Sequence, residues 1–165
     1  MEKRNILFVM SSLRNGGAER SLVNLLQLLD YDRYNVDLLL FQNEGMFLKQ
    51  VPKEVNIISN CNKLYTLYDN NKTKALKHPY LSVVHMIGTF ISRKKTNSVA
   101  KSRQYRWEHF YKKIIPELTK EYDVAIAYMQ REQTYFLVDK VKATKKIAWV
   151  HNEYSQLGHF KEMDL

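Results

Sequence analysis

Apolar residues near the start of the chain form two patterns in succession, one continuous and one with helical spacing. Asn5–Met10 is an unbroken apolar run after its first residue, which predicts a parallel strand buried on both faces. After two glycines, apolar residues recur every three or four positions as far as Asp30, namely Ala18, Leu22, Leu25, Leu26 and Leu29. This spacing predicts an amphipathic helix.

The same alternation continues along the rest of the chain. Further strands are predicted at 34–41, 55–58, 122–128 and 146–150, with a short helix before the second of these and a helix at 133–141. Strand, helix and strand in this order predict right-handed parallel crossovers. We therefore expect an α/β fold in which an open, mainly parallel, Rossmann-like sheet has helices on both faces.

A basic and largely helical segment, at about 64–115, interrupts this alternation. Pro79 is expected to begin or kink one helix, which continues to Ile91, and a second helix carries Trp107, Phe110 and Tyr111. Residues 94–102 between them are expected to form a polar loop. The aromatic and basic residues together fit docking on an anionic membrane, but the aromatic side chains could equally pack into the core.

Composition narrows the class of protein. The 165 residues fit one domain, and 26 Lys and Arg against 17 Asp and Glu give a charge of +9, which favours anionic partners. Nucleic acid is not expected, because no known binding module accompanies the charge. Cys61 is the single cysteine, and no apolar run reaches about 18 residues, so we expect a cytoplasmic protein without a membrane span.

Candidate chemistry lies where strands end, because ligands of open α/β sheets bind beyond the carboxyl ends of the strands. These segments are 11–20 and 151–155. Gly16 and Gly17 either make a simple turn or let a phosphate or sugar approach the backbone at a helix start. Dinucleotide binding is disfavoured because the Gly-x-Gly-x-x-Gly pattern is absent, although Glu44 could serve as the acidic residue of such a site. ATP hydrolysis is disfavoured because the lysine of a Walker motif is absent.

Two segments resemble family 4 retaining glycosyltransferases of the GT-B fold. Phe8–Leu13 followed by Gly16–Leu22 is similar to the opening of those enzymes, and Ile147–Asn152 is similar to the strand and histidine that line their acceptor side. The resemblance implies that the backbone of Gly16 and Gly17 approaches the donor diphosphate or sugar. It also implies that His151 is catalytic and hydrogen-bonds the transferred sugar, although a lone histidine at a strand end is more often structural. Possible acceptor or second-rank residues are Ser12, Glu19, Arg20 and Asn152. Glu19 could equally neutralise the helix start, and Arg20 could equally be solvated.

The resemblance also implies a division of labour between two domains. Residues 1–165 would be the acceptor-binding half, inactive alone, and a C-terminal domain absent from this chain would hold the nucleotide-sugar. The expected reaction is hexosyl transfer, with retention, to a cell-surface polysaccharide or lipid-linked acceptor at the cytoplasmic face of the membrane. No cofactor or metal is expected, and His78, His85, His109 and His159 lack metal-ligand spacing. The alternative is a non-catalytic, membrane-associated subunit that binds acceptor or lipid.

Overall fold

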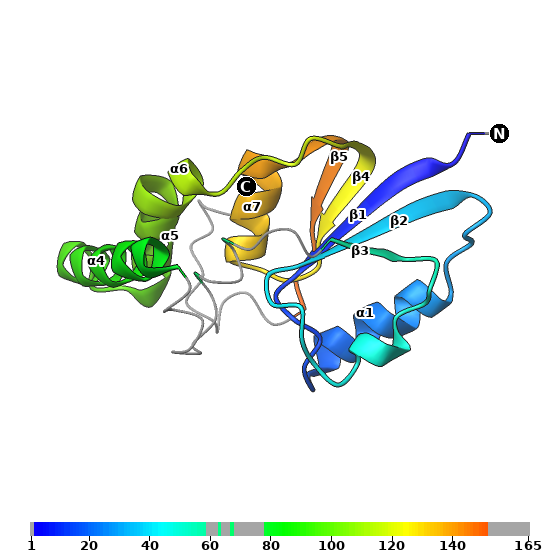
Figure 1. Cartoon of the computed structure of the whole chain (residues 1–165), viewed down its shortest axis with the longest axis horizontal. Helices are drawn as coiled ribbons and strands as arrows, with labels where there is room; N and C mark the ends of the chain where they lie inside the picture. The colour runs from blue at the N-terminus through cyan, green and yellow to red at the C-terminus, as the bar shows by residue number, and fades with distance from the viewer. Residues whose placement is uncertain (1, 59–62, 64–66, 68–77, 152–165) are drawn as a thin grey trace.

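The computed structural model describes residues 2–58, 63, 67 and 78–151, which form a five-stranded sheet with helices on both faces (Figure 1). The strand order is β3-β2-β1-β4-β5, and each adjacent pair is parallel. The strands are β1 (Arg4–Met10), β2 (Tyr34–Leu40), β3 (Asn56–Ile58), β4 (Glu121–Ala127) and β5 (Lys142–Ala148). The predicted α/β, Rossmann-like fold class is confirmed.

β1 lies at the centre of the sheet, and its side chains divide between two cores. Leu7 and Val9 pack beneath α7 (Glu132–Lys140), while Phe8 and Met10 pack against α1 (Gly17–Gln27) on the opposite face. All four of these side chains are buried. Burial on both faces explains the continuous apolar run, since each such side chain stabilises the fold by about 1.5–3 kcal/mol.

Most of the basic segment before residue 78 lies outside the described residues, and residues 79–114 form a helical unit beside α7 (Figure 1). It contains α4 (Pro79–Lys95), α5 (Val99–Arg106), a π-helical turn η2 (Trp107–Tyr111) and α6 (Lys112–Ile114). Trp107 and Tyr111 are buried in the core that α7 covers. For these two aromatic residues the core-packing alternative is therefore correct.

The predicted loop at 94–102 is wrong, because helix occupies most of it. Only residues 96–98 separate α4 from α5. The polar residues join the two helices: the buried hydroxyls of Ser92 and Ser102 are 2.8 Å apart, and Thr96 Oγ1 donates to the Ser92 carbonyl. Gly88 allows close packing, since a Cβ there would lie 3.3 Å from the ring of Phe110. Serines that resemble loop residues in the sequence thus form a helix-helix contact.

β5 also differs from its prediction at 146–150. It begins at Lys142 and ends at Ala148, and it carries Lys142, Lys145 and Lys146 in place of a continuous apolar run. As an edge strand, β5 gains its stability from backbone pairing with β4, and lysines on such a strand oppose pairing with other molecules. Between β2 and β3 the predicted short helix is a three-residue 3-10 turn, η1 (Leu48–Gln50).

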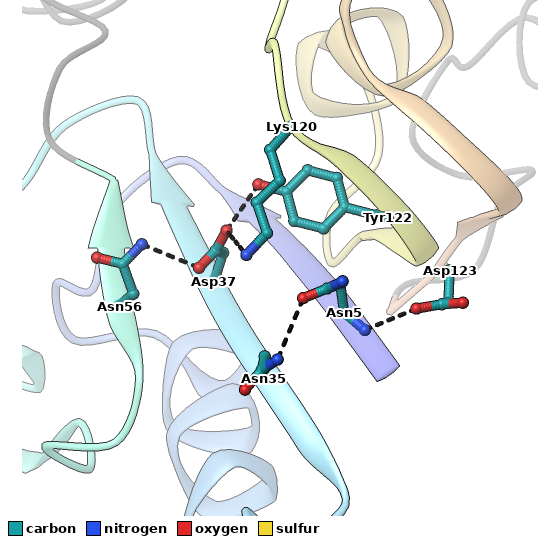
Figure 2. A network of polar contacts seen from close by, with 7 residues as sticks. All are labelled: Asn5, Asn35, Asp37, Asn56, Lys120, Tyr122 and Asp123. Atoms are coloured by element: carbon teal, nitrogen blue, oxygen red, sulfur yellow. Dashed lines mark hydrogen bonds and ion pairs between the residues drawn. The ribbon is translucent and has the colours of Figure 1, made fainter. Parts of the chain in front are cut away.

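A buried carboxylate, Asp37 of β2, joins three strands at the amino-terminal part of the sheet (Figure 2). It accepts hydrogen bonds from Tyr122 Oη at 2.7 Å, Lys120 Nζ at 2.9 Å and Asn56 Nδ2 at 2.9 Å. Burial by itself would raise the pKa of Asp37, but these donors and the Lys120 charge outweigh burial, so the pKa lies below its ordinary value. Burial and the Asp37 carboxylate raise the pKa of Tyr122, which stays a donor.

Candidate functional site

The strand order reverses beside β1, which fixes where a ligand crevice can form. From β1 the chain proceeds outward through β2 and β3 on one side, and through β4 and β5 on the other. The segments that follow β1, β4 and β5 therefore meet at the carboxyl edge of the sheet. They contain the glycine turn, Tyr128 and His151 respectively.

The glycine turn lies between β1 and α1. Gly16 is the N-cap of α1 with extended backbone, and a Cβ there would lie 2.8 Å from the carboxyl carbon of Glu19. The Glu19 carboxylate thus covers the start of α1, where a negative charge is stabilised by the helix dipole. At Gly17, the first helical residue, an added Cβ would meet no described atom within 4 Å. Neither backbone conformation nor packing within the described residues requires glycine at this position.

The segment after β1 is held by the segment after β2. Leu13 N donates to the Glu44 carbonyl at 2.9 Å, and the Arg14 guanidinium forms an ion pair with the Glu44 carboxylate. Gly45 has φ +131°, and a Cβ there would overlap the Leu13 carbonyl. Glu44, the acidic residue considered for a ribose site, is therefore paired with the protein, and Gly45 is a required glycine that sequence reasoning missed.

His151 follows β5 and lies against two aromatic rings. Its ring centroid is 4.7 Å from that of Tyr128, and it stacks on Trp149 at 6.1 Å with the two planes 6° apart. The side chain is half-buried, and Nε2 is buried with no hydrogen-bond partner among the described residues. A buried polar atom without a partner costs about 1–3 kcal/mol, so a hydroxyl that reaches Nε2 would relieve this cost.

Tyr128, directly after β4, links His151 to α1. Its side chain is buried, its ring packs edge-on to Phe8, and its hydroxyl lies 3.0 Å from Ser21 Oγ on α1. Tyr128 therefore contacts both His151 and Ser21, the residue that follows the 11–20 segment. Sequence reasoning missed Tyr128, although it ends a buried strand at the same edge, which was the criterion that selected His151.

The secondary candidates do not gather around this tyrosine. Ser12 is buried beneath the turn, and Arg20 is exposed on α1. Asn152 lies outside the described residues, as does His159. The structure thus connects His151 through Tyr128 to Ser21 of α1, four residues after Gly17, and leaves Ser12 and Arg20 without a described role.

The other described histidines are His78, His85 and His109, of which His78 is the exposed N-cap of α4. His85 is half-buried, and its Nδ1 lies 2.8 Å from the Tyr111 hydroxyl oxygen. His109 is exposed and stacks on Tyr105. Burial and the nearby Arg106 charge lower the pKa of His85, despite an opposing backbone hydrogen bond. In the part of the chain that the structure describes, no three His, Cys, Asp or Glu residues form a metal site.

Comparisons with known proteins leave the resemblance as the only pointer to a family. No protein-family model, no curated protein and no solved structure matches the chain. Within the described residues, no helix has both the length and the apolar character needed to cross a bilayer.

Proposed function

We propose that this chain is the acceptor-side half of a retaining, nucleotide-sugar-dependent glycosyltransferase that builds a cell-surface polysaccharide or glycolipid. The observation that carries the proposal is the Tyr128 link between His151 and α1. It connects a histidine, whose Nε2 has no hydrogen-bond partner among the described residues, to the helix that begins at Gly17. The resemblance to family 4 enzymes was based on these same two segments.

In this proposal His151 Nε2 hydrogen-bonds a hydroxyl of the transferred sugar. The α1 amino terminus stabilises the negative charge that develops on the leaving diphosphate. Gly17 lets that group approach the backbone, since no Cβ lies in its path. The Glu19 carboxylate now lies against Gly16, so the diphosphate would displace it. A nucleotide-binding domain, on this or another polypeptide, would hold the donor.

The test measures sugar transfer by the protein as its gene encodes it. A panel of radiolabelled nucleotide-sugars is incubated with a membrane extract that supplies acceptors. We expect His151→Ala to lower kcat by about 100-fold or more, the effect of removing one donor aimed at a reacting group, while the melting temperature changes little. His109→Ala, at an exposed histidine, is the matched control. Equal rates of sugar transfer by His151→Ala and by the parent would show that His151 has no catalytic role.

A second candidate function, a non-catalytic membrane-associated binding subunit, is favoured by one face of α4. Five large apolar side chains on this helix are exposed, namely Tyr80, Val83, Met86, Ile87 and Phe90. Their spacing of three or four residues puts them along one side of the helix, opposite the buried Leu81, Gly88 and Ser92. Arg93, Lys94 and Lys95 follow at its carboxyl end, and Lys94 Nζ lies 4.5 Å from the Phe90 ring centroid.

Apolar side chains bordered by cations fit the interface of an anionic bilayer at the cytoplasmic face. We expect the chain to float with vesicles that contain phosphatidylserine, less so at high salt, and not with phosphatidylcholine alone. Phe90→Glu should weaken flotation, whereas Val138→Glu, at an exposed apolar residue of α7, should not. Equal flotation with and without phosphatidylserine in the vesicles would refute docking on an anionic membrane. Flotation without sugar transfer in the encoded protein would favour the binding subunit over the enzyme.

A further inference from the structure

A cavity of about 250 Å³ with a mixed polar and apolar lining lies at the carboxyl edge of the sheet, at the ends of β2, β1 and β4. It is separate from the residues assigned above. Ser11 follows β1, Gln130 to Glu132 lie between β4 and α7, and Arg103 comes from α5. The basic helical unit thus contributes to the crevice where the strand order reverses. Small-molecule pockets usually measure about 300–1,000 Å³, so this cavity suits a compact ligand.

Gln130 gives the cavity a donor without a partner. Its side chain lines the cavity and is 6% exposed, and its amide nitrogen has no hydrogen-bond partner among the described residues. An unpaired buried amide costs about 1–3 kcal/mol, which a ligand oxygen would recover.

Arg131 adds a strained backbone at the same place. It is the one non-glycine residue in the described ranges with a positive φ, at 81°, and it is the N-cap of the nine-residue α7. Such a conformation costs about 1–3 kcal/mol and is concentrated at functional sites. Here the first residues of α7, Glu132 and Gln133, line the cavity beside Gln130.

The charged groups favour a ligand rich in hydroxyls. Arg103 and Arg131 oppose a single carboxylate, Glu132, and the nearest atoms of Arg103 and Glu132 are 3.7 Å apart, longer than a hydrogen bond. The guanidinium, carboxylate, amide and hydroxyl groups supply both donors and acceptors on a small polar wall. A sugar ring, whose hydroxyls each donate and accept, matches this set, and the surplus positive charge also suits an acidic sugar.

We infer that this cavity binds one sugar residue. Its identification with the acceptor rests on the proposed function, but the binding itself does not. The test is saturation-transfer NMR on the 165-residue chain, with methyl glucoside, methyl galactoside, methyl mannoside, N-acetylglucosamine and glucuronate at millimolar concentration. At least one sugar should give a saturation-transfer signal. Its affinity, measured by titration, should fall at least tenfold in Gln130→Leu and in Arg103→Ala. Gln27→Leu, at an exposed glutamine of α1, is the matched control.

Gln130→Leu should fold at least as stably as the parent, because it removes an unpaired buried amide. A sugar signal that survives in both cavity variants, or no signal from any sugar, would overturn the inference. So would complete displacement of the sugar by an equal concentration of inorganic phosphate, which would indicate a simple anion site. If the encoded protein has no transfer activity but the variants lose sugar binding, the sugar site is supported and the proposed enzyme activity is not. If Gln130→Leu leaves sugar transfer unchanged, the enzyme activity is supported and the cavity is not the acceptor site.

Discussion

Removal of the Asp37 carboxylate is the perturbation whose magnitude the structure defines best. Asp37→Ala leaves three donors without their acceptor, and these donors differ in burial. Tyr122 is 3% exposed, whereas Asn56 is exposed and the Lys120 side chain is 43% exposed, so the last two can return to water. Lost hydrogen bonds to a charged group cost about 1.5–3 kcal/mol each, while an exposed ion pair contributes about 0–1 kcal/mol.

We therefore expect Asp37→Ala to lower the free energy of unfolding by about 3–4 kcal/mol, near the range for a broken buried pair. Tyr122→Phe should cost about 1.5–3 kcal/mol, and Lys120→Met less than about 1 kcal/mol. For a chain of this length 1 kcal/mol corresponds to about 2–4 °C, so the melting temperature of Asp37→Ala should fall by roughly 10 °C.

The effect should also depend on pH with a defined sign. Because the pKa of Asp37 is lowered by folding, its ionisation stabilises the native state above the unfolded pKa of about 3.9. That contribution is lost as the pH falls through the folded pKa. The difference between the parent and Asp37→Ala should thus be constant from pH 5 to 7 and shrink below about pH 4.

Urea unfolding followed by circular dichroism at several pH values measures these differences. Asp32→Ala, at an exposed aspartate, is the control and should change stability by less than about 0.5 kcal/mol. A cost below about 1 kcal/mol for Asp37→Ala would refute this reasoning, as would a cost for Lys120→Met larger than that for Tyr122→Phe.

Three further predictions concern other parts of the chain. Gly17→Ala should raise stability by about 0.5–1 kcal/mol, since its Cβ meets open space, yet lower sugar transfer; equal transfer would make the glycine a simple turn residue. Trp107→Phe removes the 2.7 Å hydrogen bond from Nε1 to the Asp139 carboxylate and should lower the free energy of unfolding in urea by about 2–4 kcal/mol. A decrease below about 1 kcal/mol would contradict this prediction. Because the pKa of His85 is lowered by folding, the free energy of unfolding should fall as the pH drops below about 6.5. His85→Gln should reduce this dependence on pH between pH 7 and 5. An unchanged dependence would show that His85 is not its cause.

Local patterns predicted the central elements of the fold and failed at its edges. β1 and α1 were placed within a few residues because buried side chains mark every turn or pleat. β5 was displaced because an edge strand is defined by backbone pairing, to which Lys145 and Lys146 contribute without any apolar pattern. The α4–α5 contact was missed because Ser92 and Ser102 signal a loop until their hydroxyls are known to meet.

The candidate site was predictable only as separate segments. Glycines at a helix start and a histidine at a strand end are visible in the sequence, but the contact between them is tertiary. Tyr128 could be recognised as a link only after β4 was placed next to β1, more than one hundred residues earlier. The backbone of Arg131 and the unpartnered amide of Gln130 leave no mark in the sequence at all.

The pairing of β1 with β4 has a consequence for how the chain folds. Val9 and Ala127 are neighbours in the sheet, so one edge of β1 stays unpaired during synthesis until β4 has been made. An open strand edge in a nascent chain invites association with other molecules. The α4–α5 hairpin consists of local contacts, which form fast and shorten the flexible loop that β4 must close. We therefore expect the basic helical unit to assemble before the sheet is complete, and so to assist the folding of the domain whose crevice it borders.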